Sequence, residues 1–253
     1  MKVFGRYSRY YDLLYRDKDY EKEAGYVDRL IKRYAGRDSR TLLDIGCGTG
    51  RHGMKFADKG YKVFGIDKSS EMVRIARTAA ASLGKEIDFH VSDSTRFNLN
   101  KKFDIAVALF HVMSYQIDNN SLLGTLKNTH KHLKKGGLFI FDFWYGPAVL
   151  NRKPRLATKI IKDGERLIKR TAVPKLDANT DTVSVHYEMS VKDKKNASAE
   201  KFNEYHVMRY LFLPELRLML DIAGFKVMKC LKWMCSKKKL SEDSWNGLII
   251  AGK

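Results

Sequence analysis

The chain has 253 residues, of which 44% are hydrophobic and 30% charged, a composition that excludes disorder along the whole chain. Its apolar runs, such as 105–110 and 138–141, fall far short of the roughly 20 residues that a membrane-spanning helix needs, and no signal peptide is expected. A formal net charge of +19 favours an anionic partner, although ordinary lysine usage accounts for it equally well. Three cysteines without a disulfide or metal-ligand pattern predict reduced thiols in a cytoplasmic protein.

Residues 1–40 are rich in tyrosine and turn helical between 23 and 34, where apolar side chains recur on one face. From residue 41 short apolar strands alternate with helical segments. Strands are predicted at 41–45, 62–66, 87–91, 103–109 and 138–143, and helices at 52–59, 70–83 and 121–133. Because the strands are nearly continuous in apolar character, the alternation predicts a parallel sheet with helices on both faces.

The pattern changes after Trp144 to one that is typical of antiparallel strands. Alternating runs at 182–191 and 204–212 are joined by a polar turn at 193–198, and a helix then ends at a glycine suited to a C-cap. Two final segments, 225–231 and 246–251, are predicted to close the sheet. The chain therefore divides into an N-terminal helical lid (1–40), a core (41–144 and 213–253) and a strand-rich insertion (145–212).

The most specific motif follows the first strand, where the sequence from Asp44 to Gly50 reads Asp-Ile-Gly-Cys-Gly-Thr-Gly. Glycines let the backbone approach a ligand closely, but such a loop alone also occurs in dinucleotide sites. Here the carboxylate of Asp44 would repel a pyrophosphate, whereas it could accept a hydrogen bond from an ammonium group. The next two strands end at Asp67, suited to ribose hydroxyls, and at Asp93-Ser94, suited to an adenine edge. Acids after three successive strands are far more specific than the loop alone.

Over residues 41–143 these motifs resemble the class I S-adenosylmethionine-dependent methyltransferases. The resemblance implies an α/β, Rossmann-like fold with a seven-stranded, mostly parallel sheet and an antiparallel strand insertion. It implies S-adenosyl-L-methionine as cofactor, with Asp67 on the ribose and Phe110 near the sulfonium, and it implies no metal. The cofactor-binding residues implied are Tyr11, Tyr15, Asp44, Gly46, Cys47, Gly48, Gly50, Asp67, Lys68, Met72, Asp93, Ser94 and Phe110.

The segment 108–115 after the fourth strand limits the acceptor chemistry. It contains no proline for an adenine N-methyltransferase clamp, no cysteine nucleophile for pyrimidine C5 transfer and no carboxylate cluster for a metal-dependent catechol enzyme. A direct displacement on a small amine or hydroxyl, driven by positioning, is favoured instead. Another small metabolite remains an alternative acceptor, RNA is disfavoured, and a cofactor-binding module without catalysis is the non-enzymatic alternative.

Outside the core the chain resembles the nucleotide-linked aminosugar N,N-dimethyltransferases. The similarity lies in Tyr-Tyr-Asp-Leu-Leu-Tyr at 10–15, Lys-Asp-Tyr at 18–20, and the segments 143–147 and 185–187. It implies a small-molecule acceptor, the amine of a nucleotide-linked aminosugar, which would be anionic and would not involve nucleic acid or a membrane. The sequence does not determine the oligomeric state, for which a homodimer is one option.

The same resemblance implies roles for single residues, with the N-terminal lid covering the cofactor and the insertion binding the acceptor. Where that family tends to have a histidine after the fourth strand, this chain has Tyr115. The catalytic residues implied are Tyr11, Tyr115 and His186, with the strand face that carries His186 turned toward the site. The substrate-binding residues implied are His111, Trp144, Tyr145 and Arg209; for Arg209 a phosphate contact and a surface salt bridge are equal alternatives.

Overall fold

The central sheet contains seven strands in the order β10-β11-β5-β4-β1-β2-β3. The structure is a computed structural model that describes residues 3–35, 38–193, 195 and 198–253. Five strands run parallel, namely β1 (Thr41–Ile45), β2 (Lys62–Asp67), β3 (Asp88–Val91), β4 (Phe103–Ala108) and β5 (Leu133–Trp144). The strand β11 (Asn246–Gly252) pairs antiparallel with β5, and β10 (Lys226–Lys232) pairs antiparallel with β11. The expected mostly parallel, seven-stranded sheet is confirmed.

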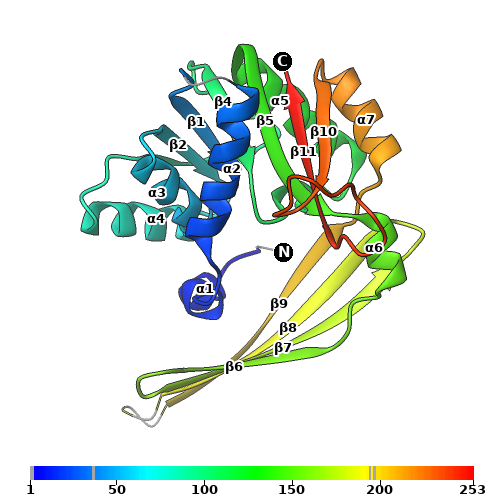
Figure 1. Cartoon of the computed structure of the whole chain (residues 1–253). Helices are drawn as coiled ribbons and strands as arrows, with labels where there is room; N and C mark the ends of the chain where they lie inside the picture. Colours follow the sequence, from blue (N-terminus) through cyan, green and yellow to red (C-terminus); the bar gives the residue numbers. More distant parts are fainter. Residues whose placement is uncertain (1–2, 36–37, 194, 196–197) are drawn as a thin grey trace.

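Helices cover both faces of this sheet (Figure 1). On one face α2 (Tyr20–Tyr34) and α3 (Arg51–Asp58) pack against β1, β4 and β5, and α4 (Ser70–Ser82) packs beside them over β3. On the other face lie α5 (Asn119–His132) and α7 (Leu213–Ile222), whose leucines contact a second apolar cluster. Each layer forms because apolar side chains recur every three or four residues along one side of the helix. The predicted helices are confirmed, with boundaries shifted by one to three residues.

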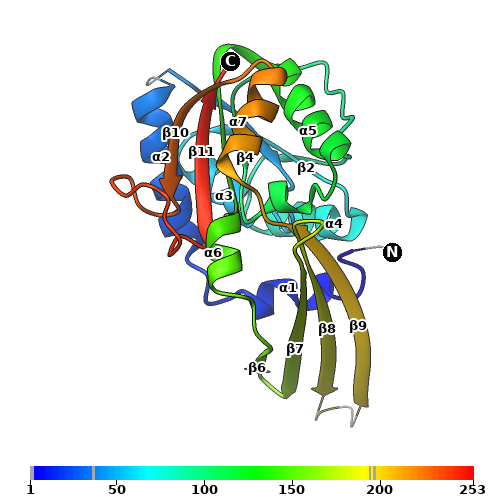
Figure 2. The same cartoon turned by 90° about the vertical axis from the view of Figure 1, so that its right-hand side faces the viewer.

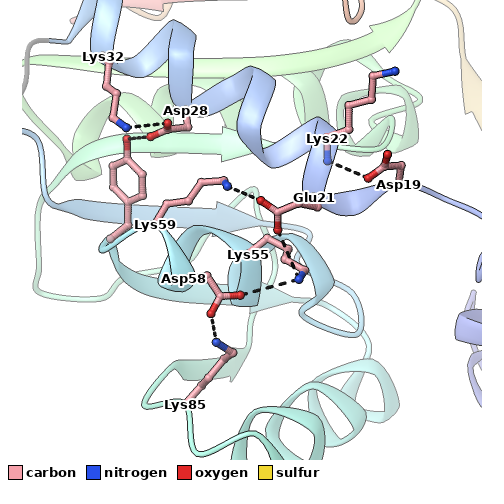
Figure 3. Close-up of polar contacts among 10 residues, drawn as sticks. Asp19, Glu21, Lys22, Asp28, Lys32, Lys55, Asp58, Lys59 and Lys85 are labelled. Atoms are coloured by element: carbon pink, nitrogen blue, oxygen red, sulfur yellow. Dashed lines mark hydrogen bonds and ion pairs between the residues drawn. The ribbon is translucent and has the colours of Figure 1, made fainter.

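Polar contacts fasten α2 to the helix below it (Figure 3). The carboxylate of Glu21 lies 2.5 Å from the ammonium of Lys59 and 3.4 Å from that of Lys55. Further along α2, the buried Asp28 accepts hydrogen bonds from the Tyr61 hydroxyl and the Lys32 ammonium, each at 2.8 Å. Ion pairs as exposed as those of Glu21 add little to stability, so the apolar face of α2 supplies most of the stabilisation.

A second sheet of four long antiparallel strands extends away from the core (Figures 1 and 2). It consists of β6 (Ala157–Asp163), β7 (Arg166–Asp177), β8 (Thr182–Asp193) and β9 (Ser198–Arg209), and the helix α6 (Gly146–Asn151) connects it to β5. All four strands fall within the predicted insertion, although only β8 and β9 correspond to the predicted runs at 182–191 and 204–212. Residues 194, 196 and 197 of the predicted polar turn lie outside the described residues.

The N-terminal segment, residues 3–15, lies beside the second sheet and below the core, and includes the helix α1 (Ser8–Leu14) (Figure 2). Its buried side chains share one apolar cluster with the second sheet. That cluster is formed by Tyr7, Leu14, Ile161, Ile168, Met189 and Val191. The segment also contacts the core, since the hydroxyl of Ser69 donates to the carbonyl of Phe4. The N-terminal segment thus connects the two sheets.

Within the described ranges, no helix has the length and apolar character required to cross a membrane.

Candidate active site

The glycine-rich loop between β1 and α3 borders open space at the carboxyl edge of the sheet. Gly46, Gly48 and Gly50 all have positive φ, at 68°, 55° and 78°. A Cβ at Gly50 would lie 2.7 Å from the Phe89 ring, so packing requires glycine there. A Cβ at Gly48 would meet nothing within 4 Å. The loop therefore leaves the backbone at Gly48 accessible to a ligand, as a cofactor in contact with this loop requires.

Asp67, the last residue of β2, is fixed beside this loop. Its carboxylate accepts hydrogen bonds from the amide of Gly48 at 2.9 Å and from that of Ser69 at 2.7 Å. Burial raises the pKa of Asp67, while the two amides oppose that rise. Each carboxylate oxygen can accept more than one hydrogen bond, so the group keeps capacity for the two hydroxyls of a ribose.

Asp44 is a buried carboxyl group next to the loop with no cationic partner among the described residues. It lies within β1, is 2% exposed, and its Oδ2 has no hydrogen-bond partner among the described residues. Burial and then the charge of Asp67 raise its pKa to about 7, against a hydrogen bond from the amide of Gly53. Buried carboxylates are normally partnered. An ammonium group bound beside Asp44 would supply the missing charge, which fits the amino-acid end of S-adenosylmethionine.

Asp93 follows β3 as a permanently charged group. Its carboxylate accepts from the amide and hydroxyl of Thr95 at 3.0 and 2.8 Å, and lies 3.0 Å from the ammonium of Lys68. Partial burial raises the pKa of Asp93, but these contacts outweigh it and lower the pKa to about 2. The hydroxyl of Ser94 lies 3.1 Å from that of Thr125 on α5. Both residues expected at the adenine thus already have hydrogen-bond partners within the protein.

Two other expected cofactor contacts are buried by the protein itself. Met72 is 1% exposed in the first turn of α4, where its amide binds the Ser69 hydroxyl. Cys47 packs against α4 and Phe89. Any contact that these residues make with a ligand would therefore come mainly from the backbone.

A strained turn after β4 places Phe110 over the site. Phe110 and His111 have φ values of 69° and 66°, a region that costs a side-chain-bearing residue about 1–2 kcal/mol. The buried Asp142 of β5 holds this turn, since its carboxylate accepts from the His111 amide at 3.2 Å and lies 2.7 Å from the imidazole Nδ1. Sequence reasoning missed Asp142, although an acid within an apolar strand was a usable signal.

Aromatic rings of the N-terminal segment lie against this turn. The ring of Tyr15 packs edge-on against Phe110 at 5.1 Å and against Tyr11 at 4.8 Å, measured between centroids. The hydroxyl of Thr49, within the glycine loop, donates to Asp12 at 2.7 Å. The structure thus brings Tyr11, Tyr15, Phe110 and the loop together, as the expected cofactor site requires.

Three comparisons identify the protein class. Residues 42–137, which include all three strand-end acids, match the family model described as a methyltransferase domain. A dTDP-4-amino-2,3,4,6-tetradeoxy-D-glucose N,N-dimethyltransferase of Saccharopolyspora spinosa is 26% identical over 85% of this chain and 84% of its own. A dTDP-3-amino-3,4,6-trideoxy-alpha-D-glucopyranose N,N-dimethyltransferase of Streptomyces venezuelae is 26% identical over 86% and 89%.

Solved structures share the fold. An S-adenosylmethionine-dependent methyltransferase from Clostridium acetobutylicum superposes with a TM-score of 0.82 at 23% identity, covering 98% of this chain and 97% of the other. Streptomyces venezuelae DesVI gives a TM-score of 0.81 at 22% identity, covering 97% of each chain. Residues 42–137 thus form a methyltransferase domain, and the chain as a whole shares the fold of S-adenosylmethionine-dependent methyltransferases.

The second sheet of this methyltransferase presents a different face to the site from the one expected. On β8, Tyr187 stacks on Tyr7 of the N-terminal segment at 5.4 Å, whereas His186 stacks on Tyr205 at 4.3 Å on the opposite face. This corrects the expectation that the His186 face would turn toward the site. Neighbouring residues of a strand point to opposite faces, so when Tyr187 faces the N-terminal segment, every second residue of β8 faces it too and His186 faces away.

The Tyr187 face carries polar residues that sequence reasoning missed. Tyr115, which ends the short helix η1 (Val112–Tyr115), has its hydroxyl 2.8 Å from Nδ1 of His206. His206 lies on β9, and Glu204 of the same strand has its carboxylate 3.1 Å from Nε2 of the His206 ring. The strand register places Glu204 opposite Tyr187 and His206 two residues further along β9. A Glu-x-His pattern in a predicted strand was the only signal available in the sequence.

The remaining expected acceptor residues have separate surroundings. Trp144 lies near His111, with ring centroids 6.0 Å apart, so these two remain together at the rim. Tyr145 caps α6 and packs toward Phe143. Arg209 bonds Asn119 at 2.8 Å and pairs with Glu215. Of the two alternatives for Arg209, the salt bridge is the one formed, which corrects the assignment to a phosphate.

The last two glycines of the loop, Gly48 and Gly50, predict contrasting variants. Gly48→Ala adds only left-handed strain of about 1–2 kcal/mol, because its Cβ enters open space. Gly50→Ala adds a collision with Phe89 and Ala76. Thermal unfolding should therefore show a larger loss of stability for Gly50→Ala, whereas Gly48→Ala should stay folded but lose stabilisation by S-adenosylhomocysteine. Normal stabilisation of Gly48→Ala by that ligand would contradict the assignment of the loop.

Asp44 predicts a pH dependence of the cofactor-free protein. Its folded pKa of about 7 exceeds the ordinary 3.8, so between these values the folded state holds a proton that the unfolded state has lost. The free energy of unfolding should therefore fall as pH rises from 4 to 7, by up to about 1.4 kcal/mol per unit from this group. Urea unfolding of Asp44→Asn should show a shallower slope, with the remainder from Asp67. An unchanged slope would show that Asp44 is ionised throughout.

Proposed function

We propose that this methyltransferase transfers a methyl group from S-adenosylmethionine to the amine of a nucleotide-linked aminosugar. Relatives named as aminosugar N,N-dimethyltransferases align with more than four fifths of the chain. The observation that carries the proposal is the position of the N-terminal segment. It bonds to the glycine loop through Asp12 and to β9 through Glu204, so it lies across the carboxyl edge of the core between the cofactor loop and the second sheet. A site covered by such a segment suits a small acceptor better than RNA.

Tyrosine hydroxyls and one arginine meet where the N-terminal segment packs on the second sheet. The Arg170 guanidinium of β7 donates to the hydroxyls of Tyr7 and Tyr15 at 2.9 and 3.1 Å. Burial raises the pKa of Tyr7 and of Tyr187, so both keep their protons at neutral pH. Among the described residues Arg170 pairs with no carboxylate. A half-buried cation of this kind favours an anionic acceptor, such as a sugar linked to a diphosphate.

The chain's own contribution to the reaction is positioning. S-adenosylmethionine supplies an electrophilic methyl group on a sulfonium when it is bound. The glycine loop, Asp44 and Asp67 would hold the two ends of that cofactor, and Phe110 with Tyr15 would exclude water from the methyl group. Tyr11 and Tyr115 would orient the acceptor amine for in-line attack, which lowers the entropic barrier. His111 and Trp144 remain candidates for the rim of the acceptor site.

Two broader features belong to the same proposal. The outer face of the second sheet exposes Ile160, Val173 and Tyr205, which a second copy of the chain could cover in a homodimer. The three cysteines stay unpaired, which suits the reducing cytoplasm. Light scattering during gel filtration tests the homodimer.

The substrate class is tested by methyl transfer from labelled S-adenosylmethionine to nucleotide-linked aminosugars, free small amines and RNA. We expect incorporation into the nucleotide-linked sugars. Any RNA binding should vanish near physiological salt, because it would depend on phosphate contacts alone. Methylation of RNA that persists at such salt, with none of the sugars, would contradict the proposal.

Arg170 gives a residue-level test of the acceptor side. Arg170→Gln should raise the KM for the sugar at least tenfold, since a hydrogen bond to a charged group contributes about 1.5–3 kcal/mol. Affinity for S-adenosylhomocysteine should stay unchanged. The matched control is Lys169→Gln, which removes a charge from the exposed face of the same strand. Equal effects of the two substitutions would show that only net charge matters.

A further inference from the structure

Three side chains from two distant parts of the chain form a continuous line of hydrogen bonds beside the proposed acceptor space. The Tyr115 hydroxyl of η1 lies 2.8 Å from Nδ1 of His206, and Nε2 of His206 lies 3.1 Å from Oε1 of Glu204. His206 is 2% exposed and Glu204 is 6% exposed. Buried polar groups that are hydrogen-bonded in a line have few alternative partners. The identity of each donor and acceptor along the line therefore determines which atoms carry protons.

The hydrogen-bond partners of Glu204 determine which ring nitrogen of His206 carries the proton. Besides His206, its carboxylate accepts from the backbone amides of Phe4 at 2.6 Å and Tyr7 at 3.4 Å. Because its other partners are backbone amides, Glu204 acts as an acceptor, and the ring nitrogen that faces it, Nε2, carries the imidazole proton. Nδ1 of His206 then carries a lone pair, which accepts the Tyr115 O–H. The other titratable groups against the imidazole, Tyr7 and Tyr187, are neutral phenols.

The chemistry of an amine acceptor needs a proton acceptor at this place. An aliphatic amine is mostly protonated at neutral pH, as the lysine pKa of about 10.4 illustrates, and an ammonium has no lone pair to attack a methyl group. Burial raises the pKa of Tyr115, so the phenol alone is no base. Because its hydroxyl is hydrogen-bonded to Nδ1 of His206, however, the phenol oxygen can accept one proton while its own proton passes to that nitrogen.

We propose that Tyr115, His206 and Glu204 form a proton relay that converts the bound ammonium of the acceptor into a free amine. The ammonium gives its proton to the Tyr115 oxygen as the Tyr115 proton passes to Nδ1 of His206, and the Glu204 carboxylate stabilises the resulting imidazolium. The amine lone pair then forms the N–C bond while the S–C bond breaks and its electron pair stays on sulfur. This inference rests on the proposed function and assigns a role to two residues outside the motifs found in the sequence.

The relay is coupled to the position of the N-terminal segment. The carboxylate that orients His206 is the one that holds the Phe4 and Tyr7 amides, so the imidazole is aligned when that segment lies across the site. The same segment carries Tyr11 and Tyr15 against Phe110. Closure over the cofactor and alignment of the base are therefore one event.

Kinetics of Tyr115→Phe, His206→Ala and Glu204→Gln with a nucleotide-linked aminosugar test the relay. Tyr115→Phe removes one oxygen and leaves the ring packing in place. We expect kcat at pH 7 to fall about 10²- to 10⁴-fold, the usual contribution of general acid–base catalysis, with the KM for the sugar within a few-fold. The loss should shrink as pH rises and the free amine becomes abundant, and imidazole should partly restore His206→Ala. Glu188→Gln, on the exposed face of β8, is the matched control and should behave as wild type.

A second measurement does not depend on turnover. Nitrogen-15 NMR of histidine in the wild-type protein should show His206 neutral with its proton on Nε2, and Glu204→Gln should change that spectrum. A proton on Nδ1, or an unchanged kcat in folded Tyr115→Phe, would overturn the relay. A loss of kcat in His206→Ala without pH or imidazole rescue would mean that the network only holds the N-terminal segment. Failure of the wild type to methylate any nucleotide-linked aminosugar would instead contradict the proposed function.

Discussion

The site depends on one carboxylate, Glu204, which joins two parts of the chain that are far apart in sequence. Two backbone amides near the N-terminus bind it, and they come from a short segment whose helix of seven residues could not be stable alone. Burial of Tyr7 and Leu14 against the second sheet stabilises the segment further. Without these contacts the cofactor loop would face open solvent, and the aromatic side chains at 7–15 would have no fixed position.

Local strain at the end of β4 has a similar dependence on distant residues. Phe110 and His111 adopt left-handed backbone angles that their own sequence does not favour. Asp142, on the neighbouring β5, stabilises this turn by accepting hydrogen bonds from the amide of His111. This turn also fixes the position of η1. Val112 at its start packs against Gly46, and Tyr115 at its end contacts His206. One buried acid therefore links the cofactor loop to the acceptor side.

The two ends of the site carry groups of opposite charge. At the cofactor end Asp44 and Asp67 lie close enough for one to raise the pKa of the other, which favours a cationic group between them. At the second-sheet end Arg170 lies among tyrosine hydroxyls with a positive charge. A cationic cofactor and an anionic acceptor would thus be drawn to different ends, although the net charge of +19 is spread over the whole chain.

The sequence by itself determined the core, because its signals are local. Apolar periodicity marked the strands and helices, and acids at the ends of neighbouring parallel strands necessarily meet at one edge of the sheet, as Asp67 and Asp93 do. Only the tertiary structure decided which face of β8 meets the N-terminal segment, since strand alternation is symmetric between His186 and Tyr187. It also decided that Arg209 pairs with Glu215 and that His206 meets Tyr115. Those contacts join residues many positions apart, and they follow from strand register and layer packing, which no short stretch of sequence encodes.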